Sequence, residues 1–138
     1  MSKKSELVKI FESAARKAGK LIKKEFGKVT ESKVQSKDLG DFVTNTDLET
    51  ENILLNILKK YFPNSSYLTE ESDPFKGNDE TIVIDPIDGT SNFIHGIPSI
   101  AIVIARVHKE EITDGIIFNP VSDELFFATK DKGAWCNN

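Results

Sequence analysis

Cysteine and long apolar runs are both scarce in this sequence. The single cysteine, Cys136, excludes an internal disulfide and fits a reducing compartment. No apolar run approaches the roughly 20 residues needed to cross a membrane. The basic N-terminus is also not followed by the uninterrupted apolar segment of a secretory signal. These absences predict a cytoplasmic protein with no membrane partner.

An excess of positive charge is also lacking. The 22 acidic residues outnumber the 18 basic ones, for a net charge of −4. This argues against nucleic acid as the main partner, because binding to a phosphate backbone needs a basic face. Basic residues crowd the N-terminal region, but their helical spacing is typical of a solvated helix face. With 38% apolar and 29% charged residues, the chain is expected to form one globular domain, 1–138.

Two amphipathic helices are predicted in the first half of the sequence. Apolar residues spaced three and four apart mark residues 5–26 as a helix. Thr46 and Glu49 have the form of a capping box at the start of a second helix, which Pro63 ends. The intervening segment 28–43 has few apolar residues and a turn signal, so a loose hairpin or an extended segment is expected there.

From residue 66 onward the sequence is typical of strands. Short stretches rich in β-branched and aromatic side chains predict strands at 67–69, 81–84, 99–107, 111–118 and 124–129. Two helices followed by consecutive strands indicate an α+β fold, with the helices packed on a mainly antiparallel sheet. The aromatic residues expected in the core of this second half are Phe126, Phe127 and Trp135.

The stretch DPIDGT, residues 85–90, directly follows a predicted strand. If the strand ends at Asp85 and a turn follows, the two carboxylates can converge, and they repel each other unless a cation lies between them. Mg²⁺ prefers such hard oxygen ligands. Thr90 can cap a short helix that begins at Ser91, and a helix N-terminus is a site for anions. The stretch therefore predicts a cation site beside a phosphate site, although Asp, Pro and Gly are also ordinary turn residues.

Two further acidic positions support the metal-site interpretation. Glu70 also follows a predicted strand, and if that strand lies beside the strand at 81–84, Glu70 comes close to Asp85. Asp47 lies at the start of the second predicted helix, next to Thr46. Each acid alone is typical of a helix cap or of a solvated side chain. Jointly the acids supply enough oxygen ligands for two metal ions.

Three blocks of the sequence resemble those of the inositol monophosphatase family of Mg²⁺-dependent phosphatases. They are DFVTNTD at 41–47, EES at 70–72 and DPIDGTSNFIHG at 85–96. The last block is highly specific, and the resemblance covers essentially the whole chain; it is greatest to bacterial members, including the extragenic-suppressor type. The resemblance implies the N-terminal half of a layered αβαβα fold and the hydrolysis of a phosphorylated polyol such as myo-inositol monophosphate.

The resemblance also implies roles for individual residues. The implied Mg²⁺ ligands are Glu70, Asp85, Asp88 and the main-chain oxygen of Ile87. The implied phosphate and substrate contacts are Asp88, Gly89, Thr90 and Ser91. Asp47 would orient Thr90, and Thr90, Glu70 and the first metal would together activate a water that attacks phosphorus in line. His95 is expected to be a structural histidine.

Members of this family are longer, and the block that completes their second metal site has no counterpart in this sequence. The C-terminal domain is therefore expected to be absent, and only the first metal site to be nearly complete. Weak Mg²⁺ binding and little or no turnover follow from that expectation. Dimerisation is common in the family, and an uncovered sheet edge would favour a homodimer.

Three alternatives stay open at this point. A haloacid-dehalogenase-type phosphatase has the signature Asp-x-Asp-Gly-Thr, whereas two residues separate the aspartates here. Fructose-bisphosphatases and nucleotide-bisphosphate (PAP) phosphatases share the acidic core but have different acceptor pockets. The third alternative is not an enzyme but a regulatory or interaction module that has kept the motif.

Overall fold

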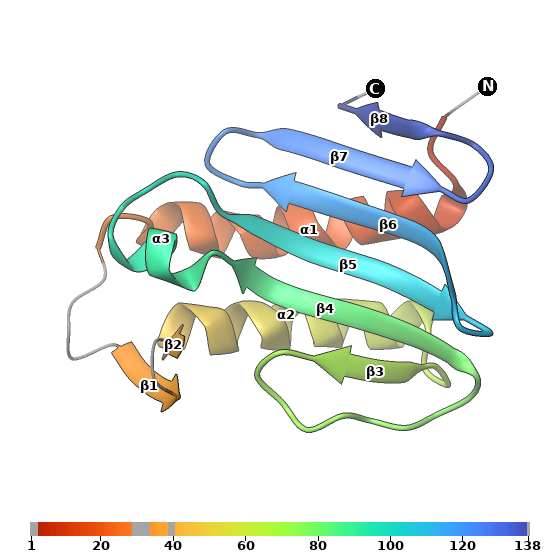
Figure 1. Ribbon diagram of the computed structural model, residues 1–138, viewed down its shortest axis with the longest axis horizontal. Helices are drawn as coiled ribbons and strands as arrows, with labels where there is room; N and C mark the ends of the chain where they lie inside the picture. The colour runs from red at the N-terminus through yellow and green to blue at the C-terminus, as the bar shows by residue number, and fades with distance from the viewer. Residues whose placement is uncertain (1–2, 29–33, 39–40, 138) are drawn as a thin grey trace.

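The computed structural model describes residues 3–28, 34–38 and 41–137, and in them two long helices lie on one face of a six-stranded sheet (Figure 1). The elements in chain order are α1 (Glu6–Glu25), β1 (Val34–Asp38), β2 (Asp41–Thr44), α2 (Asn45–Tyr61), β3 (Ser66–Thr69), β4 (Glu80–Asp88), α3 (Thr90–Ile94), β5 (Ala101–His108), β6 (Glu111–Asn119), β7 (Glu124–Thr129) and β8 (Ala134–Cys136). The predicted α+β class with a mainly antiparallel sheet is confirmed.

Helix α1 packs an apolar face onto the sheet, mainly against β6. The Ser5 side chain caps the helix and accepts a hydrogen bond from the Val8 N–H at 3.1 Å. The buried residues recur every three or four positions: Val8, Phe11, Ala14, Ala15, Ala18, Gly19 and Ile22. Lysines such as Lys17 and Lys20 lie on the exposed side, in agreement with the solvated helix face expected from the sequence.

The start of helix α2 differs from the sequence prediction. Thr46 and Glu49 do not form the capping box; Thr44 and Asp47 form it. The Thr44 hydroxyl accepts from the Asp47 N–H at 3.2 Å, and the Asp47 carboxylate accepts from the Thr44 N–H at 2.8 Å. Thr44 is the last residue of β2 and keeps an extended backbone, which is the geometry of an N-cap, so strand leads directly into helix. The helix ends before Pro63, as predicted.

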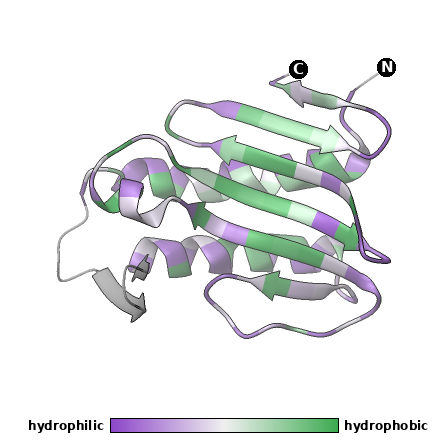
Figure 2. Cartoon of the chain, viewed as in Figure 1, coloured by the Kyte–Doolittle hydropathy of each residue, from purple (hydrophilic) through white to green (hydrophobic). Residues whose placement is uncertain are grey.

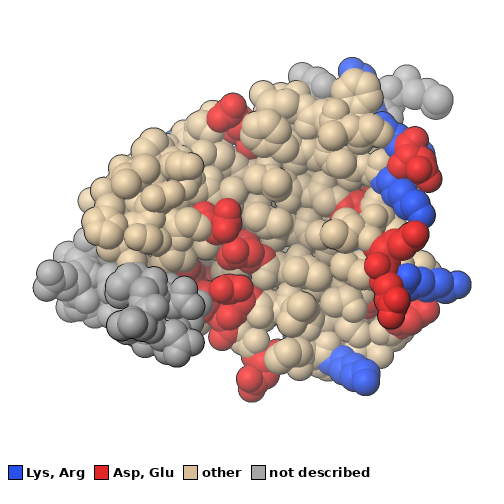
Figure 3. Space-filling model, viewed as in Figure 1, with Lys and Arg blue, Asp and Glu red and all other residues tan. Residues whose placement is uncertain are grey.

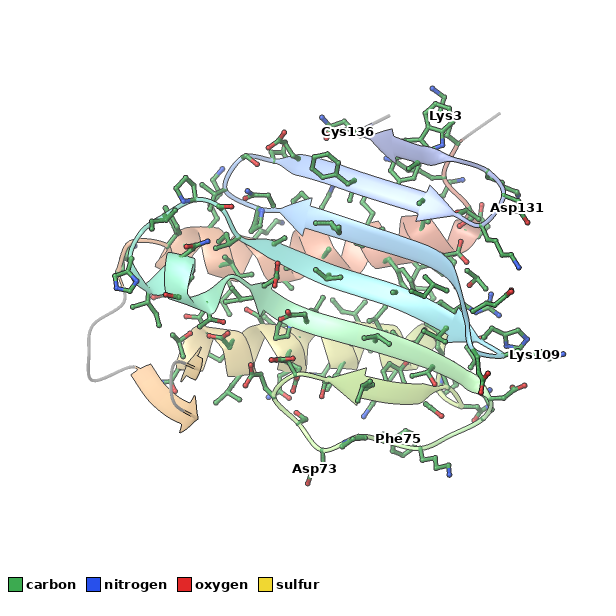
Figure 4. The ribbon with its side chains drawn as sticks, viewed as in Figure 1. Lys3, Asp73, Phe75, Lys109, Asp131 and Cys136 are labelled. Carbon is green, nitrogen blue, oxygen red and sulfur yellow. The ribbon has the colours of Figure 1, made fainter. Side chains whose placement is uncertain are left out.

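The sheet has the strand order β3-β4-β5-β6-β7-β8. Strands β3 and β4 are parallel, and every other neighbouring pair is antiparallel. All the predicted strands are present; the strand at 124–129 has the predicted bounds, and the others have shifted ends. Strands β1 and β2 pair antiparallel, in agreement with the loose hairpin that was one of the two alternatives expected in the segment 28–43. The short strand β8 was not predicted. It lies beside the N-terminal region: Figure 4 shows Cys136 near Lys3, and the Lys3 ammonium lies 4.1 Å from the ring centroid of Trp135.

The two faces of the sheet differ in what covers them. Toward the helices, alternate apolar side chains of the strands are buried, and the strands are strongly hydrophobic in Figure 2. On the opposite face, Ile112, Ile117 and Phe126 remain 68%, 48% and 44% exposed and surround a hollow of about 700 Å³. The prediction that Phe126 lies in the core is wrong, because it alternates with Phe127, which faces the helices. Trp135 is partly buried against the core.

None of the helices in the described ranges combines the length and apolar character needed to span a bilayer.

Candidate metal and phosphate site

The C-terminal end of β3 brings Glu70 beside Asp85 of β4. The strands are parallel and Thr69 pairs with Ile84, so the residues that follow, Glu70 and Asp85, are neighbours at the same edge of the sheet. The juxtaposition expected from the sequence is therefore present in the structure. On the face drawn in Figure 3, one group of acidic side chains lies toward this end of the sheet without lysines or arginines beside it, and a second acidic group lies among basic side chains at the opposite end.

Strand β4 does not end at Asp85, as the sequence indicated, but continues to Asp88. Its pairing with β5 shifts between these residues. Asp85 is opposite Val103 and Asp88 is opposite Ala101, so β4 advances by one residue more than its partner. This is the pattern of a β-bulge, and Pro86, which has no N–H to donate to the ladder, lies within it. The two aspartates therefore lie on a bent strand and not on a turn.

Asp85 is the most strongly perturbed acid of the site. Burial, followed by the charges of Glu70, Asp88 and Asp47, raises the pKa of Asp85 to about 7, against the opposing effect of a hydrogen bond from the Ile87 backbone. One carboxylate oxygen of Asp85 is buried without a hydrogen-bond partner. A half-buried carboxyl with an unsatisfied oxygen and three acidic neighbours is a position where a bound cation would lower the free energy.

The carboxylates do not form a closed cage on their own. Within residues 3–28, 34–38 and 41–137, no group of three or more His, Cys, Asp or Glu side chains is arranged to hold a metal ion. An ion at Asp85 would therefore also need main-chain, water or substrate oxygens. Such an incomplete set of carboxylates is usual for Mg²⁺, which keeps several waters and often takes phosphate oxygens as ligands.

A buried aspartate and a threonine hydroxyl form the second part of the site. The Thr90 hydroxyl donates to Asp47 Oδ2 at 2.8 Å and lies 3.2 Å from the main-chain oxygen of Ile87. The other oxygen of Asp47 accepts from the N–H and the hydroxyl of Thr44. Asp47 is fully buried. Its carboxylate bonds to Thr44, the cap of α2, and to Thr90, the first residue of α3, and so links the two helix starts. The pairing of Asp47 with Thr90 agrees with the expectation from the sequence.

The cap of helix α3 is Gly89, and the prediction that Thr90 caps this helix is wrong. Gly89 has φ +89°, a left-handed conformation that non-glycine residues rarely adopt. A Cβ at Gly89 would also lie 2.9 Å from the main-chain oxygen of Ser99. Thr90 therefore takes the first position of the helix, which leaves its hydroxyl free to reach Asp47 rather than a helix N–H.

Gly89→Ala is expected to lower the free energy of unfolding by about 2–4 kcal/mol, because both the backbone conformation and the contact with Ser99 are unfavourable. Gly96→Ala is the matched control, since Gly96 has φ +71° but no atom within 4 Å of an added Cβ. Urea unfolding should give a smaller loss for Gly96→Ala. Equal losses would show that the approach of the Ser99 oxygen has no energetic weight.

The remaining predicted site residues lie around this centre. Asp88 is exposed and, with Ser99 and Asn119, lines a small hollow of about 170 Å³. Ile87 is buried and directs its main-chain oxygen toward Thr90. Ser91 is exposed in the first turn of α3, and its main-chain oxygen lies 2.7 Å from Nδ1 of His95. His95 thus bonds back to its own helix, in agreement with a structural role.

Sequence reasoning missed one residue near the site. Glu51 is 2% exposed on α2, and its carboxylate accepts hydrogen bonds from the N–H of Glu71 and the hydroxyl of Ser72. The only sequence signal is its spacing, four residues after Asp47, which places both acids on one side of the helix. Nothing local distinguishes Glu51 from an ordinary exposed glutamate of an amphipathic helix.

Solved structures of known proteins share this architecture. The chain is 38% identical to the extragenic suppressor protein suhB from Bartonella henselae, with a TM-score of 0.93 over 97% of this chain and 53% of that one. It is 32% identical to an IMPase from Thermotoga maritima, with a TM-score of 0.90 over 97% of this chain and 52% of that one. The class of fold is therefore that of the suhB and IMPase proteins.

The sequence comparison is more specific. The model of the inositol monophosphatase family matches residues 3–138, and the chain belongs to that family. An inositol-1-monophosphatase from Caulobacter vibrioides is 42% identical over 125 residues, which are 88% of this chain and 49% of that protein. The chain spans about half the length of the curated relatives it matches. The family resemblance seen in the sequence is confirmed, and the haloacid-dehalogenase alternative is set aside.

Proposed function

We propose that this chain carries the first Mg²⁺ site and the phosphate site of a phosphatase for phosphate monoesters of inositol or a similar polyol. One observation carries the proposal: Asp85 has a buried oxygen without a partner among the charges of Glu70, Asp88 and Asp47. Membership of the inositol monophosphatase family supports the reaction, and the name of the Caulobacter relative supports the class of substrate.

The donor set of the proposed metal site suits Mg²⁺. The carboxylates of Glu70, Asp85 and Asp88 and the main-chain oxygen of Ile87 are all hard oxygen ligands. Burial and then the charges of Glu70 and Asp88 raise the pKa of Asp85, and a divalent cation would offset both effects. When bound, Mg²⁺ would lower the pKa of a coordinated water and polarise a phosphoryl oxygen.

Thr90 and Glu70 would act on the attacking water. A hydroxyl has one proton, and Thr90 donates its proton to Asp47 at 2.8 Å, so its lone pairs are left to accept a hydrogen bond from a water. The fully buried Asp47 keeps Thr90 in this orientation, since rotation of the hydroxyl would leave a buried carboxylate oxygen with one partner fewer. Glu70 at the strand edge could accept a proton from the same water.

The chain around α3 would bind the phosphate and the polyol. The main-chain N–H groups of Gly89 and Thr90, at the start of the helix, and the exposed Ser91 would contact phosphate oxygens. Asp88 would contact substrate hydroxyls, because it lines a hollow together with the polar Ser99 and Asn119. The fructose-bisphosphate and PAP types of substrate are the alternatives against which inositol phosphate is compared in the assay below.

The proposal is tested by calorimetric titration with Mg²⁺ and by phosphate release from myo-inositol 1-phosphate, with fructose 1,6-bisphosphate and PAP in parallel. Because the proposal assigns only one of the metal sites to this chain, we expect weak Mg²⁺ binding and slow release that EDTA abolishes. Release that persists in EDTA, or no binding of Mg²⁺ at all, would contradict the proposal. Rates as high as those of a full-length inositol monophosphatase would contradict the expected need for a second half.

A further inference from the structure

We infer that Glu51 is a positioning residue that fixes the location of Glu70, an inference that rests on the proposed role of Glu70 in metal binding. Glu51 follows Asp47 by one turn of α2, on the same buried side of the helix. Asp47 holds the start of its own helix and the Thr90 hydroxyl. Glu51 instead holds a segment that lies twenty positions further along the chain.

The Glu51 carboxylate closes the turn that follows β3. One oxygen accepts from the Glu71 N–H at 2.9 Å, and the other accepts from the Ser72 hydroxyl. Inside the turn, the Ser72 N–H donates to the Thr69 hydroxyl oxygen at 3.2 Å. Glu70 lies between Thr69 and Glu71, so both of its neighbours are held. The main chain on both sides of Glu70 is therefore held in a turn that the buried Glu51 carboxylate closes.

A single helix thus supports both halves of the candidate site. Asp47 holds Thr90, on the phosphate side, and Glu51 holds the turn that carries Glu70, on the metal side. The helix is itself anchored to β4, the strand that carries Asp85, and to α1. Because a helix rises about 1.5 Å per residue, the four-residue spacing of Asp47 and Glu51 separates the two supports by about 6 Å along the helix axis. Loops alone would leave this separation to vary.

The test is the binding of Mn²⁺, as a spectroscopic substitute for Mg²⁺, followed by the electron paramagnetic resonance of the free ion. Glu51→Ala should weaken binding by about tenfold or more, the effect typical of a residue that orients a metal ligand. Glu51→Gln should bind Mn²⁺ nearly as well as the parent chain. Its amide oxygen can accept from the Glu71 N–H, and its NH₂ group can donate to the Ser72 hydroxyl.

Two further variants separate positioning from stability. Ser72→Ala removes one bond of the turn at an exposed residue and leaves no buried cavity, so it should weaken Mn²⁺ binding even if Glu51→Ala does not fold. Leu58→Ala removes a fully buried side chain from the same helix and should cost about 2–5 kcal/mol of stability. At a temperature where circular dichroism shows it folded, Leu58→Ala should keep the parent affinity for Mn²⁺.

The outcomes distinguish this inference from the proposed function. Parent-like Mn²⁺ affinity in every folded variant of Glu51 and Ser72, while Asp85→Asn abolishes binding, would overturn the inference and leave the proposed function intact. Equal loss of affinity in Leu58→Ala and Glu51→Ala would overturn it as well, because the effect would then follow stability. If the parent chain bound no Mn²⁺, the proposed function and the inference would both fail.

Discussion

Asp85→Asn is expected to abolish metal binding and, at the same time, to stabilise the metal-free protein. The raised pKa of Asp85, about 7, shows that its negative charge is unfavourable in the folded chain. Asparagine has nearly the same shape without the charge, so the cost of burying the charge and the repulsion from Glu70 and Asp88 both disappear. The same substitution removes a carboxylate from the proposed Mg²⁺ site. Function and stability should therefore change in opposite directions.

The pH dependence of stability follows from the same pKa. In the folded chain Asp85 binds its proton more tightly than in the unfolded chain, where the value is near 3.8. The folded state therefore holds more protons between pH 3.8 and about 7, and the contribution of Asp85 to the free energy of unfolding falls as the pH rises through this range. Below this range the unfavourable contribution is absent, and above pH 7 it is fully present.

Solvent limits how much Asp85→Asn can raise the free energy of unfolding. At about 1.4 kcal/mol per pKa unit, the difference corresponds to about 4 kcal/mol for a fully buried carboxyl. Asp85 is half-buried, and water screens part of the repulsion, so we expect about 1–3 kcal/mol at pH 8. Urea unfolding of the parent chain and of Asp85→Asn at pH 8 and at pH 4 measures the difference in the free energy of unfolding. This difference should be smaller at pH 4.

Asp73→Asn is the control for this prediction. Asp73 is exposed on the loop between β3 and β4, where its side chain points away from the sheet (Figure 4). It should change neither the stability nor the binding of Mg²⁺. Destabilisation by Asp85→Asn in the absence of metal would show that the Asp85 carboxylate has a favourable partner, and undiminished Mg²⁺ binding would remove Asp85 from the metal site.

The proximity of Glu70 and Asp85 could be predicted because its sequence signals are local. A short apolar strand pattern followed by an acid occurs both before Glu70 and before Asp85, and pairing of the two strands is enough to make the acids neighbours. The order of helices and strands was predictable for the same reason, since periods of 3.6 and 2 residues are visible in a short window. These features need no knowledge of distant contacts.

The capping box of α2 could not be predicted from local pattern alone. Two overlapping candidates are present, Thr44 with Asp47 and Thr46 with Glu49, and both fit a cap followed three residues later by an acid. The tertiary contact of Asp47 distinguishes them, because Asp47 is buried and also accepts from the Thr90 hydroxyl. That contact joins residues 43 positions apart, which no local window includes.

The bulge in β4 and the role of Glu51 depend on tertiary structure in the same way. Asp-Pro followed by Asp-Gly is typical of a turn, and only pairing with β5 shows that the strand continues as far as Asp88. Glu51 has its partners in the turn at 69–72 and would be solvated in an isolated helix. Sequence alone therefore could not predict the buried contacts that hold the site residues in place.

Asp47→Ala is expected to cause a larger loss of stability than Thr90→Ala, which removes only one of the bonds that Asp47 makes. Asp47 is fully buried, and its carboxylate accepts from the Thr44 N–H, the Thr44 hydroxyl and the Thr90 hydroxyl. Hydrogen bonds to a charged group contribute about 1.5–3 kcal/mol each, and an N–H left buried without a partner is costly. We expect the free energy of unfolding to fall by about 3–5 kcal/mol. This range already allows for the favourable effect of removing one buried negative charge near Asp85.

Thr90→Ala separates the two roles of Asp47. It removes the bond to the site but leaves the capping box of α2 intact, so urea unfolding should give a loss of only about 1–2 kcal/mol. The double variant completes a cycle whose coupling energy measures the Asp47–Thr90 bond itself. A loss in Thr90→Ala as large as that in Asp47→Ala would mean that the cap contributes nothing. A coupling energy near zero would mean that Thr90 is held by other contacts, and the proposed orientation of the attacking water would lose its support.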